Sequence, residues 1–167
     1  MNFQNNFCAE LRRRPYAVAF LRGNERYPTI RGQVMFYKVS GGVILRAELA
    51  GLPLAKEQCK EPVFAFHIHS GDVCTGTDSD PFADAGGHYN PDSCPHPYHA
   101  GDLTPIFGVD GRAFSVLLTN RFTVPEILGR TVILHAMPDD FSTQPSGNSG
   151  EKIACGIITP TARVGFK

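Results

Sequence analysis

Histidine is the residue type in this chain best suited to metal chemistry, because imidazole nitrogens are common ligands of zinc and copper. None of the histidines lies in the first 66 or the last 32 residues; they are His67, His69, His88, His96, His99 and His135. A lone histidine is more often a surface or hydrogen-bonded core residue. Any metal site must therefore be argued from spacing.

Three histidines fall on predicted strands. His67 and His69 end the run Val63–His69, and side chains two apart on a strand point to the same face, about 6.5–7 Å apart. His135 ends a second predicted strand, Thr131–His135. Together these imidazoles form a nitrogen-rich set that suits copper.

Two carboxylates, Asp139 and Asp140, follow His135 closely. A carboxylate at this place could accept the outer N–H of a ligand imidazole and so fix its tautomer. A solvated Pro-Asp-Asp turn is the alternative.

The other three histidines belong to a long segment, 70–101, rich in Gly, Pro and Asp. His88, His96 and His99 are followed by Asp102, and three neutral imidazoles with one carboxylate are a natural tetrahedral set for zinc. Such a loop has no core of its own, so a bound metal would explain its order. The alternative is a flexible loop with histidines placed by chance.

Strand signals dominate the elements that must position these side chains. Short β-rich runs are separated by turns such as Ser40-Gly41-Gly42 and Asp110-Gly111, and a second turn-rich loop covers 136–150. No amphipathic helix, repeat or linker is visible. The pattern predicts an all-β antiparallel sandwich or barrel with strands over 16–21, 29–39, 43–49, 63–69, 103–107, 112–118, 131–135 and 153–159.

Composition narrows the class of protein. The 167 residues predict one domain, and 16 basic against 16 acidic residues predict neither a nucleic-acid nor a membrane partner. The N-terminus lacks the apolar run of a secretory signal, so we expect a cytoplasmic location, or a periplasmic or secreted one if a signal was removed. The five cysteines leave at least one free thiol.

The motifs around these residues resemble the copper,zinc superoxide dismutase family. The resemblance runs in the family's order over about residues 15–160 and rests on Phe66-His67-Ile68-His69, Gly87-His88-Tyr89-Asn90-Pro91, His99-Ala100-Gly101-Asp102-Leu103, Gly129-Arg130-Thr131-Val132-Ile133-Leu134-His135, Gly147-Asn148-Ser149-Gly150 and Ile153-Ala154-Cys155-Gly156. It implies an eight-stranded antiparallel Greek-key β-barrel, a flattened form of the sandwich, with two long functional loops. Residues 1–14 would be an N-terminal extension and 15–167 a single barrel domain.

The resemblance also implies the metals and their ligands. The family pattern matches His67, His69, His88 and His135 for copper, and His88, His96, His99 and Asp102 for zinc, with His88 bridging the two. Asp139 corresponds to an outer carboxylate that links a copper histidine to a zinc histidine. Cys74 and Cys155 match the intrasubunit disulfide of the family.

The implied activity is conversion of superoxide to oxygen and hydrogen peroxide by copper alternating between Cu(II) and Cu(I), beside a structural zinc. We expect His88 and Lys152 to act in catalysis: His88 would leave reduced copper and accept a proton, and Lys152 would guide the anion. Steering of a small anion by a positive funnel is a known property of superoxide dismutase. A homodimer is the assembly considered.

Several positions depart from the family pattern. Lys152 replaces the usual arginine beside copper and lacks its planar fork of donors, so we expect reduced activity, and Glu151 would further weaken the positive potential. Only Pro97-Tyr98 separates His96 from His99, the loop after His135 is short, and Cys74 lies nearer His69 than usual. We expect the remaining cysteines, Cys8, Cys59 and Cys94, to be simple packed thiols. A thiolate of Cys94, two residues before His96, could instead compete for zinc.

Two other functions fit parts of the pattern. A noncatalytic copper/zinc-binding protein on the same fold is favoured by Lys152 and the short loop, but a complete copper set argues against it. A zinc hydrolase with an open site is disfavoured, because no general-base carboxylate stands beside the His-x-His pair.

Overall fold

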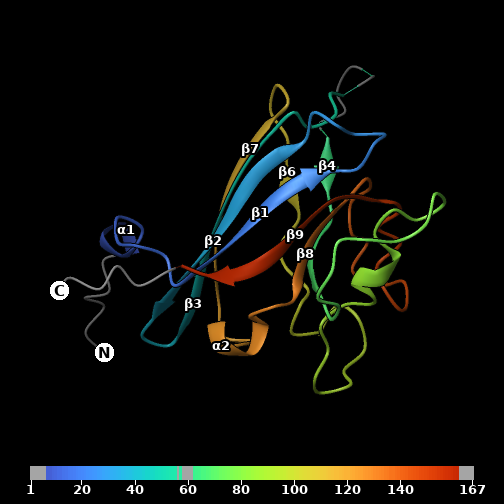
Figure 1. Ribbon diagram of the computed structural model, residues 1–167. Helices are drawn as coiled ribbons and strands as arrows, with labels where there is room; N and C mark the ends of the chain where they lie inside the picture. The colour runs from blue at the N-terminus through green and yellow to red at the C-terminus, as the bar shows by residue number, and fades with distance from the viewer. Residues whose placement is uncertain (1–6, 56, 58–61, 162–167) are drawn as a thin grey trace.

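The computed structural model describes residues 7–55, 57 and 62–161 (Figure 1). In these ranges the strands are β1 (Ala17–Gly23), β2 (Arg31–Val39), β3 (Gly42–Ala50), β4 (Val63–Phe64), β5 (Phe66–His69), β6 (Ile106–Phe107), β7 (Arg112–Thr119), β8 (Thr131–His135) and β9 (Lys152–Pro160). The helical elements described are single turns: α1 (Phe7–Glu10), η1 (Ala83–Ala85) and α2 (Val124–Ile127). The all-β prediction is confirmed.

Seven strands form one curled antiparallel sheet in the order β5-β8-β9-β1-β2-β3-β7, and β4 pairs with β6 in a small second sheet (Figure 1). Because β4 precedes β5 and β6 precedes β7, the small sheet connects the two end strands of the large one. This curled arrangement fits the predicted Greek-key barrel.

Each of the eight predicted strands is present, but two differ in extent. The run 63–69 divides at Ala65, whose N–H donates to Met137 O (2.8 Å) and whose carbonyl accepts from His135 N (2.9 Å). The run 103–107 forms ladder pairs only at Ile106–Phe107, and Pro105 has no N–H to offer a ladder.

The core lies inside the curled sheet. Along β1, Ala17, Ala19 and Leu21 are buried, whereas Phe20 between them is 63% exposed, as alternation on a strand requires. β8 instead buries every residue, because Ile133 on its outer side packs against Phe82 and Ala85 of the segment 70–101.

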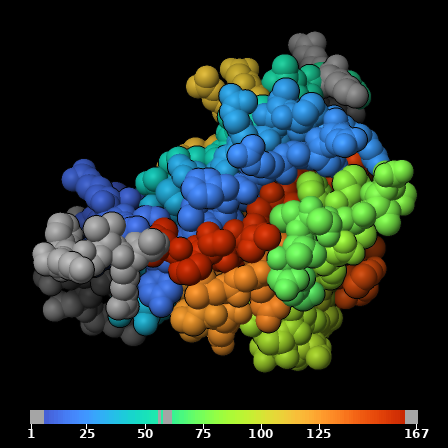
Figure 2. Space-filling model, viewed as in Figure 1, coloured from blue at the N-terminus to red at the C-terminus, as the bar shows by residue number. Residues whose placement is uncertain are grey.

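The segment 70–101, which we call the long loop, lies along β5 on the side away from β8. Ile68 N donates to Gly101 O (2.9 Å), and Tyr89 N donates to Ile68 O (2.8 Å). A Cβ at Gly101 would overlap the carbonyl of Ile68, so only glycine permits this approach. In the space-filling view the first part of the loop, in green, lies against the red C-terminal strand (Figure 2).

The N-terminal helix α1 lies near the outer face of the sheet. Leu11, just after it, packs against the buried side chains Met35, Tyr37 and Ile44 of β2 and β3. The predicted boundary between an extension and the barrel at residues 14 and 15 stays a prediction. None of the helices in the described ranges has the length and apolar character to cross a membrane.

Candidate metal centre

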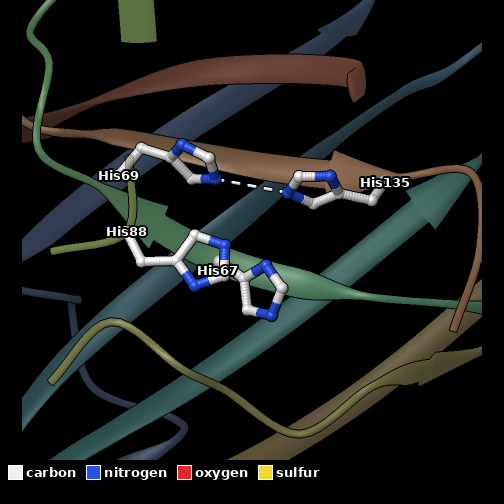
Figure 3. A group of neighbouring side chains, drawn as sticks. All are labelled: His67, His69, His88 and His135. Atoms are coloured by element: carbon white, nitrogen blue, oxygen red, sulfur yellow. Dashed lines mark hydrogen bonds between the residues drawn. The ribbon is translucent and has the colours of Figure 1, made fainter. Parts of the chain in front are cut away.

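Two groups of ligand-type side chains gather where β5 and β8 meet the loops that follow them. Within each group the ligand atoms lie within 4.8 Å of one another, and one histidine belongs to both. The first group is His67, His69, His88 and His135 (Figure 3), and the second is His88, His96, His99 and Asp102. The structure thus brings together every metal-ligand candidate predicted from the sequence.

The sheet positions three members of the first group. His67 and His69 face the same side of β5 with ring centroids 6.3 Å apart, close to the separation that strand geometry predicts. His135 ends the neighbouring strand β8, where a register shift between Leu134 and His135 changes its pairing with β9. The long loop supplies His88, whose ring lies 3.9 Å from that of His67 between centroids.

Backbone carbonyls determine the tautomers of two of these rings. His69 Nδ1 lies 2.7 Å from Gly86 O, and His135 Nδ1 lies 3.2 Å from Gly150 O. A carbonyl can only accept, so each Nδ1 carries the proton and each neutral ring keeps its lone pair on Nε2. These two Nε2 atoms face each other at 3.2 Å (Figure 3). Two facing lone pairs repel, and a cation between them would satisfy both.

Asp139 determines the tautomers of two further rings and links the groups. Its Oδ2 lies 2.8 Å from His67 Nε2, and its Oδ1 lies 2.9 Å from His96 Nε2. Since a carboxylate accepts, both Nε2 atoms donate and both lone pairs lie on Nδ1. A Cβ at Gly147 would overlap Asp139 and His96, which explains a glycine there at φ +67°.

The atoms left over are those a metal would use. Among the described residues, three buried histidine nitrogens have no hydrogen-bond partner: His67 Nδ1, His88 Nε2 and His96 Nδ1. Leaving a buried polar atom without a partner costs about 1–3 kcal/mol of folding free energy, so a ligand bound to these three nitrogens would stabilise the fold. Nitrogen-rich and mixed nitrogen–carboxylate donor sets suit copper and zinc respectively, and the residues present fit both metals.

Electrostatics keep the donors in the form that binds metal. Burial lowers the pKa of His67, lowers that of His69 well below its usual range, and lowers that of His135 to about 3, so these rings are neutral. Burial alone would raise the pKa of Asp102, but its hydrogen bond with His88 and the nearby histidines bring it below its ordinary value. Metals bind neutral imidazole and ionised carboxylate.

We expect the metal-free protein to lose stability as the pH falls from 6.5 towards about 3. The upper limit of this pH range is the ordinary pKa of histidine, and the lower limit is the lowered pKa of buried His135. In this window the unfolded chain binds protons at His67, His69 and His135 that the folded chain does not, so the free energy of unfolding decreases. Urea midpoints at pH 7.5 and pH 5 test this, and an equal or higher midpoint at pH 5 would contradict it.

Two side chains that sequence reasoning missed hold the second group in place. Gln144 Nε2 donates to His96 O (2.7 Å), and its Oε1 accepts from His96 N (3.0 Å). The Arg121 guanidinium donates to the carbonyls of Pro97, His99 and Asp102 at 3.2, 3.4 and 3.0 Å. Backbone carbonyls and amides leave no sequence signature, so no signal could have identified these partners.

A cavity of about 660 Å³ opens onto the histidines, and Lys152 lines it. Lys152 is the cross-strand partner of His135, so the predicted cation does lie beside the first group. Its Nζ, however, is 2.6 Å from Asp80 Oδ2, and Arg26 in the same cavity is 2.9 Å from Glu151 Oε1. Neither Asp80 nor Arg26 was among the site residues predicted from the sequence.

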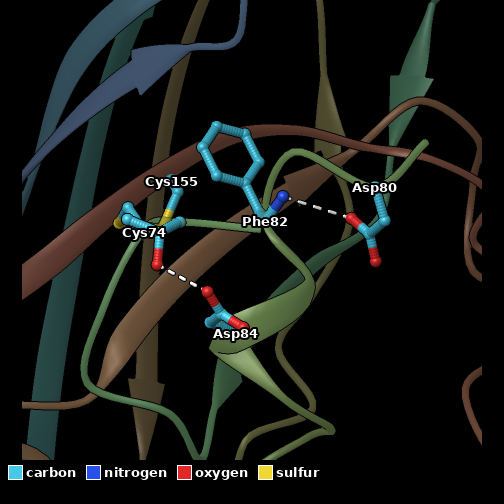
Figure 4. Close-up of a disulfide and its surroundings, with 6 residues drawn as sticks. Cys74, Asp80, Phe82, Asp84 and Cys155 are labelled. Atoms are coloured by element: carbon cyan, nitrogen blue, oxygen red, sulfur yellow. Dashed lines mark hydrogen bonds between the residues drawn. A yellow bond between two sulfur atoms is a disulfide. The ribbon is translucent and has the colours of Figure 1, made fainter. Parts of the chain in front are cut away.

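The long loop is joined to the last strand by a disulfide. Cys74 and Cys155 form an S–S bond of 2.04 Å, which confirms the pairing implied by the resemblance (Figure 4). Cys8 and Cys94 are free thiols, and neither belongs to a metal-ligand group of the described residues. Cys8 is exposed, so the prediction of a packed thiol is wrong there. Cys59 lies outside the described residues.

A sequence model of the copper/zinc superoxide dismutases matches residues 30–158, most of the chain. The chain belongs to the copper/zinc superoxide dismutase family. It is similar to the extracellular superoxide dismutase [Cu-Zn] of Mus musculus, with 34% identity over 143 residues that cover 78% of this chain. That match covers 54% of the mouse protein, so the chain spans about half its length.

A bacterial relative in the copper/zinc superoxide dismutase family is matched over more of its length. The superoxide dismutase [Cu-Zn] of Deinococcus radiodurans is 34% identical over 153 residues, which cover 78% of this chain and 84% of that protein. Among solved structures, the Cu/Zn superoxide dismutase from Brucella abortus has a TM-score of 0.70 at 23% identity and covers 84% of this chain and 98% of that one. This similarity shows the fold.

Proposed function

We propose that this protein is a superoxide dismutase, which converts superoxide to oxygen and hydrogen peroxide. Copper would be held by His67, His69, His88 and His135, and zinc by His88, His96, His99 and Asp102. The observation that carries the proposal is that His88 belongs to both groups. Its Nδ1 lies 2.7 Å from Asp102 Oδ1, whereas its Nε2 has no hydrogen-bond partner and is left for the first group.

Bound copper would supply one-electron redox chemistry, and zinc would hold the long loop. The chain's own groups have separate tasks. The carbonyls of Gly86 and Gly150 and the carboxylate of Asp139 orient the imidazoles by accepting their outer N–H protons. His88 Nε2 is placed to hold a proton that the peroxide product needs, and Lys152 attracts the anionic substrate at the cavity.

A noncatalytic copper/zinc-binding protein is the second candidate. The observation in its favour is that both cations lining the cavity, Arg26 and Lys152, are paired with carboxylates. The two pairs have no net charge, so they do not attract an anion over long range. Nothing in the described residues favours a zinc hydrolase. A homodimer and a cytoplasmic location stay predictions.

The dismutation rate of protein loaded with copper and zinc, compared with that of the zinc-only protein, tests the proposal. We expect a strictly copper-dependent reaction with kcat/KM below the ceiling of about 10⁸–10⁹ M⁻¹s⁻¹ that the fastest enzymes reach. Electron paramagnetic resonance of the Cu(II) form would show nitrogen ligation independently of turnover. Copper bound by nitrogens with negligible turnover would favour the metal-binding alternative.

A further inference from the structure

The ammonium group of Lys152 is already occupied by a carboxylate. Lys152 Nζ lies 2.6 Å from Asp80 Oδ2, and the Lys152 side chain is 16% exposed against 41% for Asp80. The contact joins the start of β9 to the long loop and borders the cavity that reaches His69, His88 and His135. A negative group therefore stands where an anion drawn by Lys152 would bind.

The long loop presents Asp80 in a fixed orientation. Asp80 Oδ1 accepts from Phe82 N (3.2 Å), and Asp80 N donates to Thr77 Oγ1 (3.2 Å). Phe82 is itself buried and packs in a cluster with Cys155 and the half-buried Cys74 (Figure 4). Because the turn holds Oδ1, Oδ2 is the oxygen that points to Lys152. The conformation of the loop therefore positions Asp80 for this ion pair.

The other charges of the cavity do not replace Lys152. Arg26 is its second cation, and the guanidinium is 2.9 Å from Glu151 Oε1 and donates to Asp78 O at 2.9 Å. Two cations and two carboxylates line this cavity, so their charges cancel. An entering anion gains attraction from Lys152 only by competing with Asp80.

We propose that Asp80 sets the anion affinity of the cavity by competing with small anions for Lys152. The inference rests on the proposed function, in which the anion is superoxide. The carboxylate lowers the affinity of the cavity for any small monovalent anion, and an anion binds by displacing Oδ2 from the ammonium. Removing the charge of Asp80 while keeping its turn frees Lys152 as an anion site.

Azide, a small monovalent anion, is the probe. Its affinity is measured from the visible absorption of the copper- and zinc-loaded protein, and again from backbone amide NMR shifts of Glu151 and Lys152 in the zinc-only protein. Asp80→Asn keeps an oxygen that can accept from Phe82 N. We expect this variant to bind azide roughly tenfold more tightly at low ionic strength, with a difference that shrinks as salt is added.

Asp78→Asn is the matched control, because it removes the same charge from an exposed residue two positions away. It should change azide affinity less than about twofold, since an exposed charge is largely screened. A second control combines Asp80→Asn with Lys152→Gln, and in this background the effect of Asp80→Asn should disappear. Equal azide affinities of Asp80→Asn, Asp78→Asn and the unaltered protein would overturn the inference, as would a gain that persists without Lys152.

Turnover is read separately from azide affinity. Tighter azide binding by Asp80→Asn, together with no dismutation by the unaltered protein, would support the role of Asp80 and contradict the proposed function. Fast dismutation by the unaltered protein, together with unchanged azide affinity of Asp80→Asn, would support the proposed function and contradict the role of Asp80.

Discussion

Asp139→Asn should weaken the binding of at least one metal by roughly 10- to 100-fold, the usual effect of losing an outer hydrogen-bond partner of a metal ligand. Asp139 accepts from His67 Nε2 at 2.8 Å and from His96 Nε2 at 2.9 Å. An amide has one accepting oxygen and one NH₂ donor, so it can serve only one of these N–H groups. The other ring must change tautomer or rotate, and its lone pair then leaves the metal group.

Competition with chromophoric chelators for zinc and for copper measures this effect. Asp140→Asn is the matched control: the neighbouring carboxylate is exposed and its Oδ atoms accept from Ser142 and Thr143 instead of a histidine. This variant should keep both affinities within about twofold, because an exposed surface charge contributes little. Metal affinities of Asp139→Asn equal to those of Asp140→Asn would contradict the role given to Asp139.

Removal of the disulfide should cost the metal-free protein about 4 kcal/mol of unfolding free energy. Cys74 and Cys155 are 81 positions apart, and cross-links that close long loops restrict the unfolded chain most. For a chain of this size the loss corresponds to a Tm roughly 10 °C lower. The buried Cys155 also packs in one apolar cluster with Ile133 and Phe82.

Urea unfolding of the metal-free Cys74→Ser variant beside the oxidised protein gives the difference directly. Cys8→Ser, which removes an exposed free thiol, should leave the midpoint unchanged. A reductant should lower the midpoint of the unaltered protein and have no effect on Cys74→Ser. Identical midpoints for oxidised and reduced protein would show that the cross-link does not carry this stability.

The strands could be predicted from the local sequence, because the alternation of apolar and polar residues involves near neighbours along the chain. The break at Ala65 was not predictable, since its two hydrogen bonds run to His135 and Met137 across the fold. The pairing of β4 with β6 depends on the same long-range contacts. One-turn helices such as α2 are too short to show a helical period.

The metal-binding side chains could be predicted because imidazole and carboxylate groups can be identified as metal ligands from the residue type alone. Spacing alone left open which histidine the two groups share, and the family resemblance pointed to His88. The tautomer-fixing carbonyls of Gly86 and Gly150 carry no side-chain signal. Asp80 is 72 positions from Lys152, and only the folded loop shows that it neutralises the expected anion guide.

The bridges between the long loop and β5 have a consequence for self-association. β5 ends the seven-stranded sheet, and its outward side is paired: His88 of the long loop bridges His69, and Asp102, just after the loop, bridges His67. His88 and Asp102 also belong to the zinc group, so the side chains that would bind zinc stand on the residues that cover this edge. An uncovered edge strand offers unpaired N–H and C=O groups to another chain. A metal held by His88 and Asp102 would therefore also keep this edge covered and oppose sheet extension between molecules.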